Sequence, residues 1–445
     1  MGPADLNTAG AHRAPATAAT PGAPANPVRR VAAASLIGTT IEFYDFYVYA
    51  TAAVLVFGPL FFPSGNEAAE TLASLATFAI AFVARPIGSV VFGHFGDRIG
   101  RKATLVAALL VMGVSTVLIG VLPTHASVGT LAPVLLCLLR FGQGFGLGGE
   151  WGGAALLATE NAPANRRALF GMLPQLGAPL GFVLANTLFI VLASTMSEDA
   201  FTAWGWRVPF LLSAVLVVLG LWIRLSLTET PVFARALAED RQVRVPVAEV
   251  LRRSWKVLVL GAFSVMLTYT LFYLTTTWSL TYGTKTLGYE RQDFLLMLCI
   301  AVLFMAAATP LSGLLSDRAG RRPVLATAMV GGAVVGLLTG PLLSSGSTAL
   351  VMVWLCAGLF FMGLVFGPIG AYLPELFPTN VRYTGASLAF NAGSILGASL
   401  APYTAVRLAQ AHGVSWVGFY LAGTAVVSLV ALALLRETRT SALED

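Results

Sequence analysis

Long apolar stretches alternate with short polar loops along most of the chain, from about residue 31 to residue 435. Each stretch is long enough to cross the hydrocarbon core of a bilayer, which takes about 20 helical residues. Backbone groups inside a bilayer must bond to one another, so spans of this length form helices. The pattern therefore predicts twelve transmembrane helices, at residues 31–57, 70–96, 103–122, 130–152, 168–194, 204–226, 256–282, 293–316, 323–345, 349–373, 382–410 and 415–435.

The composition agrees with a membrane protein and excludes several other classes. Hydrophobic residues make up 57% of the chain and charged residues only 11%, against about 25% charged in soluble domains. The basic residues behind the net charge of +6 lie in short loops rather than in one patch, which argues against nucleic-acid binding. The three cysteines lie in separate apolar stretches without histidine neighbours, so we expect no metal site and no cofactor.

The distribution of basic residues predicts the orientation in the membrane. Most of the 27 lysines and arginines fall at one end of the twelve-span topology, and the loops at the other end are mainly acidic or neutral. Short loops rich in Lys and Arg stay on the cytoplasmic side, so we expect both termini in the cytoplasm. The preference for arginine over lysine is typical of a GC-rich bacterial genome, and we expect a multi-pass protein of the bacterial inner membrane.

An internal duplication divides the chain. Residues 93–102 read GHFGDRIGRK, and residues 313–322 read GLLSDRAGRR, each between two apolar stretches. Two further pairs follow in the same order: ENAPANR after the fourth span resembles ELFPTNVR after the tenth, and Glu-Thr follows both the sixth and the twelfth. Parallel repeats of this kind place a binding site between the halves, near the bilayer midplane.

We therefore expect an all-α integral membrane protein with its twelve helices in two pseudo-symmetric six-helix bundles. The predicted division is a disordered cytoplasmic tail without a removable signal peptide (1–28), a first bundle (29–228), a cytoplasmic linker (229–255), a second bundle (256–436) and a cytoplasmic tail (437–445).

The two charged turns are candidates for a conformational latch. The residues concerned are Gly93, Asp97, Arg98, Gly100, Arg101 and Lys102 in the first turn and Asp317, Arg318 and Arg321 in the second. The glycines are expected to let the second and third spans approach and turn sharply. Asp97 can accept hydrogen bonds from a helix N-terminus or from an arginine. A basic loop that only sets the topology is the alternative, but the repeated spacing favours a latch that breaks when the conformation changes.

Two acidic side chains lie inside the first span. Glu42 and Asp45 are three residues apart and share a helix face, which Tyr49 continues one turn later. Two carboxyls buried together cannot both ionise cheaply, so one of them is expected to carry a proton. The alternative is that both pair with arginines of other helices and only hold the bundle together.

Two arginines also lie inside apolar spans, where an unpaired charge costs several kcal/mol. Arg85 precedes a proline in the second span, and Arg140 lies in the fourth span, with Gln143 one turn later. Either guanidinium can bind a substrate carboxylate through its two-pronged donor face, or can neutralise an acid of another helix.

Other candidates are polar or aromatic residues within the spans. Tyr269 and Tyr273 share one face of the seventh span, where they either contact a substrate or pack against neighbouring helices. Gln175 and Asn391 lie in spans five and eleven, where they either line a cavity or bond to another helix.

The charged turns resemble the signature of the major facilitator superfamily and its weaker copy in the second half. The segments GTTIEFYDFYVY (38–49), ARPIG (84–88) and RFGQGFGLGGEW (140–151) are similar to the metabolite:proton symporter branch of that superfamily. The resemblance covers about residues 30–440. It implies a monomer whose two halves rock about a central site lined in part by the seventh span. It also implies that Arg140 and Gln143 belong to a proton-coupling motif.

These observations predict a secondary transporter, not an enzyme, that uses the proton gradient to import a small organic acid such as shikimate or a di- or tricarboxylate. Its partners are then a small molecule, a proton and the lipid bilayer. Glu42, Asp45 and Arg140 are the candidates for proton coupling. The candidates for substrate binding are Arg140 first, Arg85 second, and then Gln143, Tyr49, Tyr269, Tyr273, Gln175 and Asn391. Uptake of a zwitterionic osmolyte such as proline or betaine, and proton-driven efflux, are the alternatives.

Overall fold

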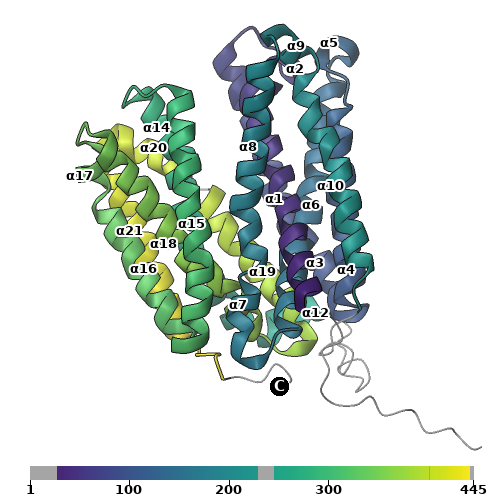
Figure 1. Cartoon of the computed structure of the whole chain (residues 1–445), viewed down its shortest axis with the longest axis vertical. Helices are drawn as coiled ribbons and strands as arrows, with labels where there is room; N and C mark the ends of the chain where they lie inside the picture. The colour runs from purple at the N-terminus through teal and green to yellow at the C-terminus, as the bar shows by residue number, and fades with distance from the viewer. Residues whose placement is uncertain (1–27, 229–244, 400, 441–445) are drawn as a thin grey trace, which may run out of the picture.

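The computed structural model describes residues 28–228, 245–399 and 401–440. Over these residues the chain is helical and contains no strand. Two bundles of long helices lie side by side, with the first half of the sequence in one bundle and the second half in the other (Figure 1). The predicted tail 1–28 lies almost wholly outside the described residues, as does most of the linker 229–255.

The first bundle begins at α1 and ends at α10. Its helices are α1 (Val28–Leu55), α2 (Phe57–Phe61), α3 (Glu67–Arg98), α4 (Arg101–Gly120), α5 (His125–Val128), α6 (Leu131–Glu160), α7 (Arg167–Gly171), α8 (Gly177–Thr195), α9 (Glu198–Ala203) and α10 (Val208–Leu225). Short 3-10 turns connect α6 to α7, α7 to α8 and α9 to α10; they are η1 (Ala164–Arg166), η2 (Pro174–Leu176) and η3 (Gly205–Arg207).

The second bundle repeats this arrangement. Its helices are α13 (Trp255–Tyr273), α14 (Ser279–Lys285), α15 (Arg291–Ala319), α16 (Arg321–Leu337), α17 (Thr339–Leu343), α18 (Thr348–Glu375), α19 (Arg382–Ser394), α20 (Ala401–His412) and α21 (Val414–Leu434), and the short helix α12 (Pro246–Arg253) precedes them in the chain. A 3-10 turn, η5 (Thr379–Val381), precedes α19, and the π-helical turns η4 (Leu274–Trp278) and η6 (Ile395–Ser399) lie within spans seven and eleven. Turns of the π type are frequent at functional sites.

The helices account for the twelve predicted spans. Nine helical stretches among the described residues meet the length and hydropathy of a membrane span. The other three crossings are α1, which carries two acids, α16 continued by α17, and α19 continued through η6 into α20. One predicted boundary is wrong: the fourth span ends at Glu160 and not at residue 152, because α6 continues through the buried and mainly apolar segment GAALLATE (153–160).

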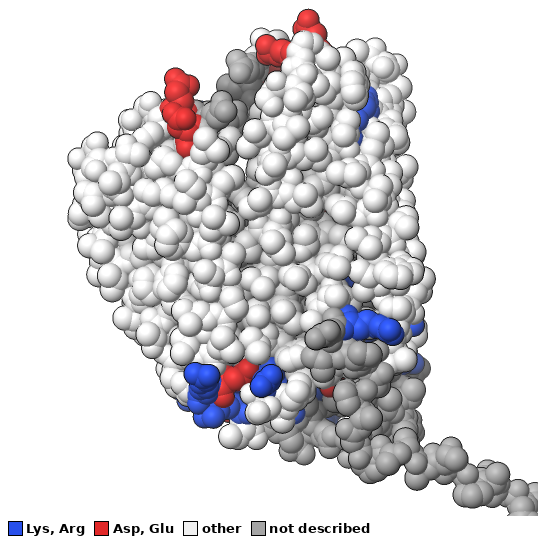
Figure 2. All heavy atoms as spheres, viewed as in Figure 1, with Lys and Arg blue, Asp and Glu red and all other residues white. Residues whose placement is uncertain are grey.

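The outer surface fits a bilayer. Large apolar side chains face outward along the helices, among them Val218, Trp222 and Leu434, each about two-thirds exposed or more. Figure 2 shows charged side chains gathered at the two ends of the molecule and a wide band between them that is nearly free of charge. We call the end that bears Arg98 and Arg318 the basic end, and the end that bears Glu198 and Glu290 the acidic end.

The two charged turns have the same internal construction. Gly100 and Gly320 adopt φ of 131° and 106°, a backbone conformation that favours glycine, and the next helix starts directly after each. Arg101 bonds to Asp97 at 3.0 Å in the first turn, and Arg321 bonds to Asp317 at 2.9 Å in the second. A second acid completes each cluster: Glu160 lies 3.5 Å from Arg101, and Glu375 lies 3.0 Å from Arg321.

Each turn also reaches into the opposite bundle. Asp97 accepts hydrogen bonds from the backbone N–H groups of Tyr383 and Thr384, at 3.1 and 3.0 Å, at the start of α19. Asp317 accepts from the N–H groups of residues 168 and 169, at 3.0 and 2.9 Å, at the start of α7. An aspartate of each bundle therefore caps a helix N-terminus of the other, where unpaired N–H groups and the helix dipole favour negative charge.

The glycines of the first turn serve this contact between bundles. A Cβ on Gly93 would lie 2.8 Å from Thr384, and a Cβ on Gly96 would lie 2.3 Å from the ring of Tyr383. The prediction that these glycines let the second and third spans approach is therefore wrong, since they face α19 instead. On the other side of the interface a Cβ on Gly370 would meet the carbonyl oxygen of Gly171 at 1.9 Å.

The described part of the predicted C-terminal tail, residues 437–440, packs against the second bundle. Glu437 accepts hydrogen bonds from the N–H groups of Arg321 and Arg322, at 3.0 and 2.9 Å, and so caps the start of α16. The hydroxyl of Thr438 donates to Glu375 at 2.5 Å. These contacts extend the second charged cluster to the last span.

Gly370→Ala is expected to open the basic end. The added methyl group meets backbone of the opposite bundle, which cannot turn aside as a side chain can, so the closed arrangement becomes strained. Spin labels on cysteines at 98 and 318, in a background with the three native cysteines replaced, should show a longer distance between the bundles. Gly423→Ala in α21 is the matched control, because its Cβ meets nothing within 4 Å. An unchanged distance in both variants would contradict the assigned interface.

Candidate functional site

A cavity of about 40 Å³ lies between the two bundles. Its lining comes from α1, α3, α6 and α8 of the first bundle and from α13, α18 and α19 of the second. Such a volume holds a few water molecules but no larger molecule. A substrate can therefore enter only when the bundles or their side chains move apart.

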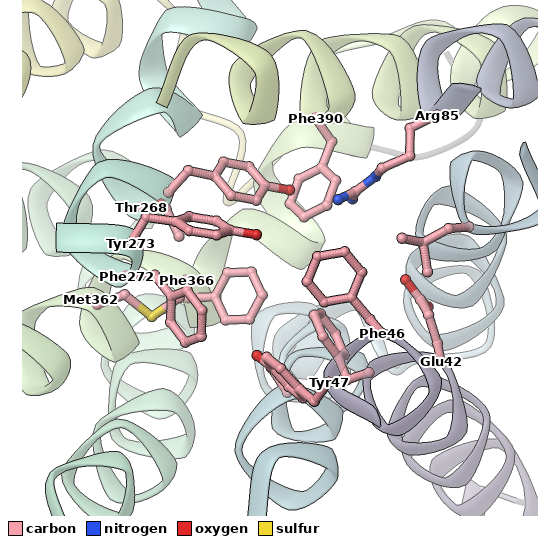
Figure 3. A pocket seen from close by; sticks show the side chains of 14 residues that line it. Glu42, Phe46, Tyr47, Arg85, Thr268, Phe272, Tyr273, Met362, Phe366 and Phe390 are labelled. Carbon is pink, nitrogen blue, oxygen red and sulfur yellow. The ribbon is translucent and has the colours of Figure 1, made fainter. Parts of the chain in front are cut away.

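Aromatic side chains dominate the wall of this central cavity. The first bundle contributes Phe43, Phe46 and Tyr47. The second contributes Tyr269, Phe272, Tyr273, Phe366 and Phe390. Figure 3 shows the rings from the two bundles converging on one space, with the hydroxyl of Tyr273 directed into it. Apart from the hydroxyls of the tyrosine rings, the polar side chains of the lining are Glu42, Arg85 and Thr268.

Arg85 reaches the cavity from α3 and is fixed there by the second bundle. Its Nε donates to Oδ1 of Asn391 in α19 at 2.9 Å, and the nitrogen-bearing end of the side chain points into the cavity (Figure 3). Asn391 donates in turn to the hydroxyl of Ser89 at 2.6 Å, and Ser89 lies 2.8 Å from the carbonyl oxygen of Gly148. The guanidinium is thus held in place by a chain of buried hydrogen bonds that crosses both bundles.

Glu42 reaches the cavity from the middle of α1. Its Oε2 is buried and has no hydrogen-bond partner in the described part of the chain. A neighbouring acid, Glu150, forms a two-pronged ion pair with Arg224 of α10 inside the first bundle. Glu150 therefore has its counter-ion, whereas Glu42 keeps one oxygen available for a proton, a water molecule or a substrate.

A second, smaller cavity of about 10 Å³ lies inside the first bundle, beside the central one. Glu42, Phe46 and Leu147 line both cavities, and Asp45, Arg140 and Gln143 line the smaller one. The smaller space is close to the minimum that one water molecule requires.

A hydrogen-bonded series runs along the smaller cavity. Arg140 donates to Gln143 at 3.0 Å, and Gln143 donates to the hydroxyl of Thr116 at 2.7 Å. Asp45 then accepts from Thr116 at 3.0 Å and from Ser213 at 2.6 Å. Glu42 and Asp45 share a helix face as predicted, but their surroundings differ. Asp45 accepts from two hydroxyl groups, whereas Oε2 of Glu42 has no hydrogen-bond partner in the described part of the chain.

Arg140 is a buried cation held mainly by aromatic rings. Its guanidinium carbon lies 3.8 Å from the ring centre of Tyr49, and 5.1 and 5.0 Å from those of Phe46 and Phe78. The Nε and one terminal nitrogen have no hydrogen-bond partner among the described residues. Rings stabilise a desolvated cation through their negative faces, which accounts for an arginine at this depth without an ion pair.

The structure brings together only part of the predicted substrate site. Arg85, Tyr269 and Tyr273 line the central cavity with Glu42. Arg140, Gln143 and Tyr49 lie in or behind the smaller cavity, so the ranking of Arg140 above Arg85 as the substrate anchor does not fit this geometry.

The side chains of Gln175 and Asn391 bond to other groups and do not line either cavity. Asn391 holds Arg85, as described above. Gln175 accepts from the indole nitrogen of Trp151 at 2.9 Å and donates to the carbonyl oxygen of Phe366 at 3.1 Å, which joins the two bundles. Both amides therefore take the bonding role that the sequence left open.

Several residues of the site were not singled out from the sequence. Arg224 is an arginine inside an apolar span, so the rule that identified Arg85 and Arg140 applies to it equally. Trp151 stacks on Phe390 of the opposite bundle, with ring centres 3.6 Å apart and planes 3° apart. No sequence signal shows which two rings of different bundles will meet.

The contacts between the bundles differ along their length. Toward the basic end, hydrogen bonds join them at Arg85, Gln175, Asp97 and Asp317. On the acidic side of the cavity wall, the bundles meet through ring contacts such as Tyr47 with Phe272, at 6.3 Å between centres. The interface is therefore tied at the basic end and joined more loosely at the acidic end.

Comparison with known proteins identifies the family. The sequence profile of the Major Facilitator Superfamily matches residues 35–390 and 284–444. The chain is 56% identical over 427 residues to the inner membrane metabolite transport protein YhjE of Escherichia coli K12, covering 94% of this chain and 97% of the relative. It is 34% identical to the shikimate transporter of the same strain (92% and 95% covered) and 32% identical to its proline/betaine transporter (92% and 84% covered).

A solved structure supports the same fold. The proton:xylose symporter XylE, bound to 6-bromo-6-deoxy-D-glucose, superposes with a TM-score of 0.76 at 18% identity, covering 94% of this chain and 98% of the symporter. The described helices, the duplicated turns and these relatives agree. The chain belongs to the Major Facilitator Superfamily and is a multi-pass inner-membrane metabolite transporter, not an enzyme.

Proposed function

We propose that this transporter imports a small organic acid together with a proton, by alternating access. The observation that carries the proposal is the central cavity, in which Arg85 supplies one cation and Glu42 one acid within an otherwise mostly apolar wall. A fixed guanidinium in such a wall is suited to one carboxylate. The two terminal N–H groups of the guanidinium match the two carboxylate oxygens, and both charged groups lose their water on binding. The relatives that carry shikimate and proline or betaine are compatible with carboxylate-bearing substrates.

In this proposal Arg85 is the substrate anchor and Tyr269 and Tyr273 contact the bound acid. Arg140 and Gln143 act on the proton side, next to Asp45 in the smaller cavity. Glu42 lines both cavities and so connects the two events. Tyr49, Gln175 and Asn391 act indirectly, the first by holding Arg140 and the others by joining the bundles at the cavity.

We place the basic end in the cytoplasm, as the distribution of arginine and lysine favours. The structure is then closed toward the cytoplasm by the two charged turns, which act as the latch. The aspartates of these turns, Asp97 and Asp317, accept the hydrogen bonds that join the bundles at this end. Arg98 and Arg318 are exposed at this end, where they can meet lipid phosphates, and Lys102 donates to the carbonyl oxygen of Leu225 at 2.9 Å.

We assign residues 29–228 and 256–436 to the two moving bundles and residues 229–255 to their cytoplasmic connection. The transporter is proposed to work as a monomer, because both bundles and the cavity between them belong to one chain. Each half of the transport cycle would then break the contacts between the bundles at one end of the molecule and form contacts at the other end.

Uptake of a zwitterionic osmolyte is the second candidate, and the aromatic wall favours it. Rings such as Tyr269 and Phe390 can surround a quaternary amine, with Arg85 on the carboxylate. Proton-driven efflux would use the same groups in the opposite direction.

Uptake into proteoliposomes tests the proposal. Labelled shikimate, citrate, α-ketoglutarate, benzoate-type acids, proline and betaine would each be offered under an inward proton gradient, with and without a protonophore. We expect one acid to accumulate several-fold above its external concentration and the protonophore to abolish this. Protein-free liposomes control for acids that cross lipid unaided. Accumulation of betaine alone would favour the osmolyte, and proton-driven loss of preloaded cargo would overturn import.

The neutral variants Glu42→Gln and Asp45→Asn are expected to abolish accumulation while substrate exchange continues. Either change removes a carboxyl from the proposed proton path but leaves Arg85 and the aromatic wall in place. Net uptake under a proton gradient should fall at least about tenfold, and counterflow of labelled against unlabelled substrate should stay within about threefold. Glu290→Gln, on the exposed acidic end, is the matched control. Full accumulation in one of the two variants would remove that acid from the path.

A further inference from the structure

We propose that the substrate is a monocarboxylate with a flat, apolar body, such as a benzoate-type acid, and not a polyhydroxylated acid or a di- or tricarboxylate. This inference rests on the proposed function, since it names the class of acid that the central cavity would select. It follows from how few polar groups the cavity offers and from where they lie.

The cavity presents one cation to a substrate. Arg85 is the arginine among the described lining residues, and the other charged lining residue is the acid Glu42. Arg140 faces the smaller cavity, and Arg224 is occupied by Glu150. A second carboxylate on the substrate would therefore meet either rings or Glu42, and both surroundings oppose a negative charge.

The cavity also offers few partners for hydroxyl groups. Apart from the two charged residues, the polar atoms of the lining side chains are the hydroxyls of Thr268, Tyr47, Tyr269 and Tyr273. The hydroxyls of Thr268 and Tyr269 are buried and have no bond among the described residues. These sites lie on α1 and α13, so a substrate ring with hydroxyls around its edge would leave several of them against Phe366, Phe390 or Met362.

The rings favour a flat body. Phe390 stacks on Trp151 at 3.6 Å and contacts the tilted ring of Tyr269 at 5.4 Å, so it is part of a continuous aromatic wall. Tyr47 and Phe272 face each other across the bundles at 6.3 Å. Separation of the bundles at the loosely joined acidic end would widen this gap. A planar acid entering there would stack between the rings while its carboxylate reached Arg85 (Figure 3).

Equilibrium binding to the purified full-length protein tests this inference without interference from leakage through lipid. The probe is benzoate, measured by isothermal titration, with benzenesulfonate, cyclohexanecarboxylate, shikimate, succinate, citrate, benzamide and betaine as competitors. We expect benzoate to bind, cyclohexanecarboxylate to bind about two- to tenfold more weakly and shikimate about tenfold or more weakly. Succinate, citrate and the uncharged benzamide should bind at least about tenfold more weakly than benzoate.

Two pairs of variants test separately how much Arg85 and the aromatic wall contribute to binding. Arg85→Gln should weaken benzoate binding at least about tenfold, whereas Arg407→Gln, exposed on α20, should leave it unchanged. Phe272→Leu should cost benzoate about two- to tenfold and leave cyclohexanecarboxylate nearly unaffected. Phe419→Leu, half exposed on α21, controls for the loss of a ring elsewhere.

The outcomes distinguish this inference from the proposed function. Tight binding of succinate, citrate or shikimate, with protonophore-sensitive uptake of the same acid, would overturn the substrate class and leave proton-coupled acid import standing. Binding of benzoate through Arg85, without proton-driven uptake of any acid, would support the class and overturn the import mechanism. Selective binding of betaine would overturn both.

Discussion

The structure depends on the cost of charge in an apolar interior. Arginines in the bilayer-facing part of a protein are tolerated only where other groups of the chain neutralise or surround them. This chain uses three different solutions. Arg224 is paired with Glu150, Arg140 lies against three rings and one amide, and Arg85 is held by an amide of the opposite bundle. Of the three, Arg85 is the one that points into the space between the bundles, which makes it the natural contact for an external anion.

At the closed basic end, buried charge is also neutralised by other groups of the chain, and here backbone N–H groups take part. Asp97 and Asp317 each serve an arginine of their own bundle and two N–H groups of the other. Separating the bundles leaves the arginine contacts in place but strips each aspartate of its backbone donors. Water must then reach both aspartates and both helix N-termini, so the two contacts are expected to open together. The duplication of the turn thus gives the basic end of the interface two ties of the same kind.

The alternation of apolar stretches with polar loops was sufficient to predict the twelve spans, because length and apolar character largely determine which segments can cross a bilayer. It placed the end of the fourth span at residue 152, although α6 continues to Glu160 through the buried, apolar residues 153–158. Residue types identified Glu42, Asp45, Arg85 and Arg140 as unusual for their depth. They could not rank them, because the ranking depends on which helix faces which across the interface. Arg85 meets Asn391, 306 positions later in the chain, and no local pattern contains that contact.

The contact between Arg85 and Asn391 links the substrate to the conformational change. Arg85 belongs to α3, and the residue that orients it belongs to α19, the helix whose start is capped by Asp97 of the same α3. Opening the basic end moves α19 away from α3 and so removes the orienting bond from the guanidinium. In the proposed cycle a carboxylate then competes with Asn391 for the same group. Affinity for the acid and closure of the basic end are thus coupled through one side chain, as a transporter requires when its two halves must sense a bound substrate.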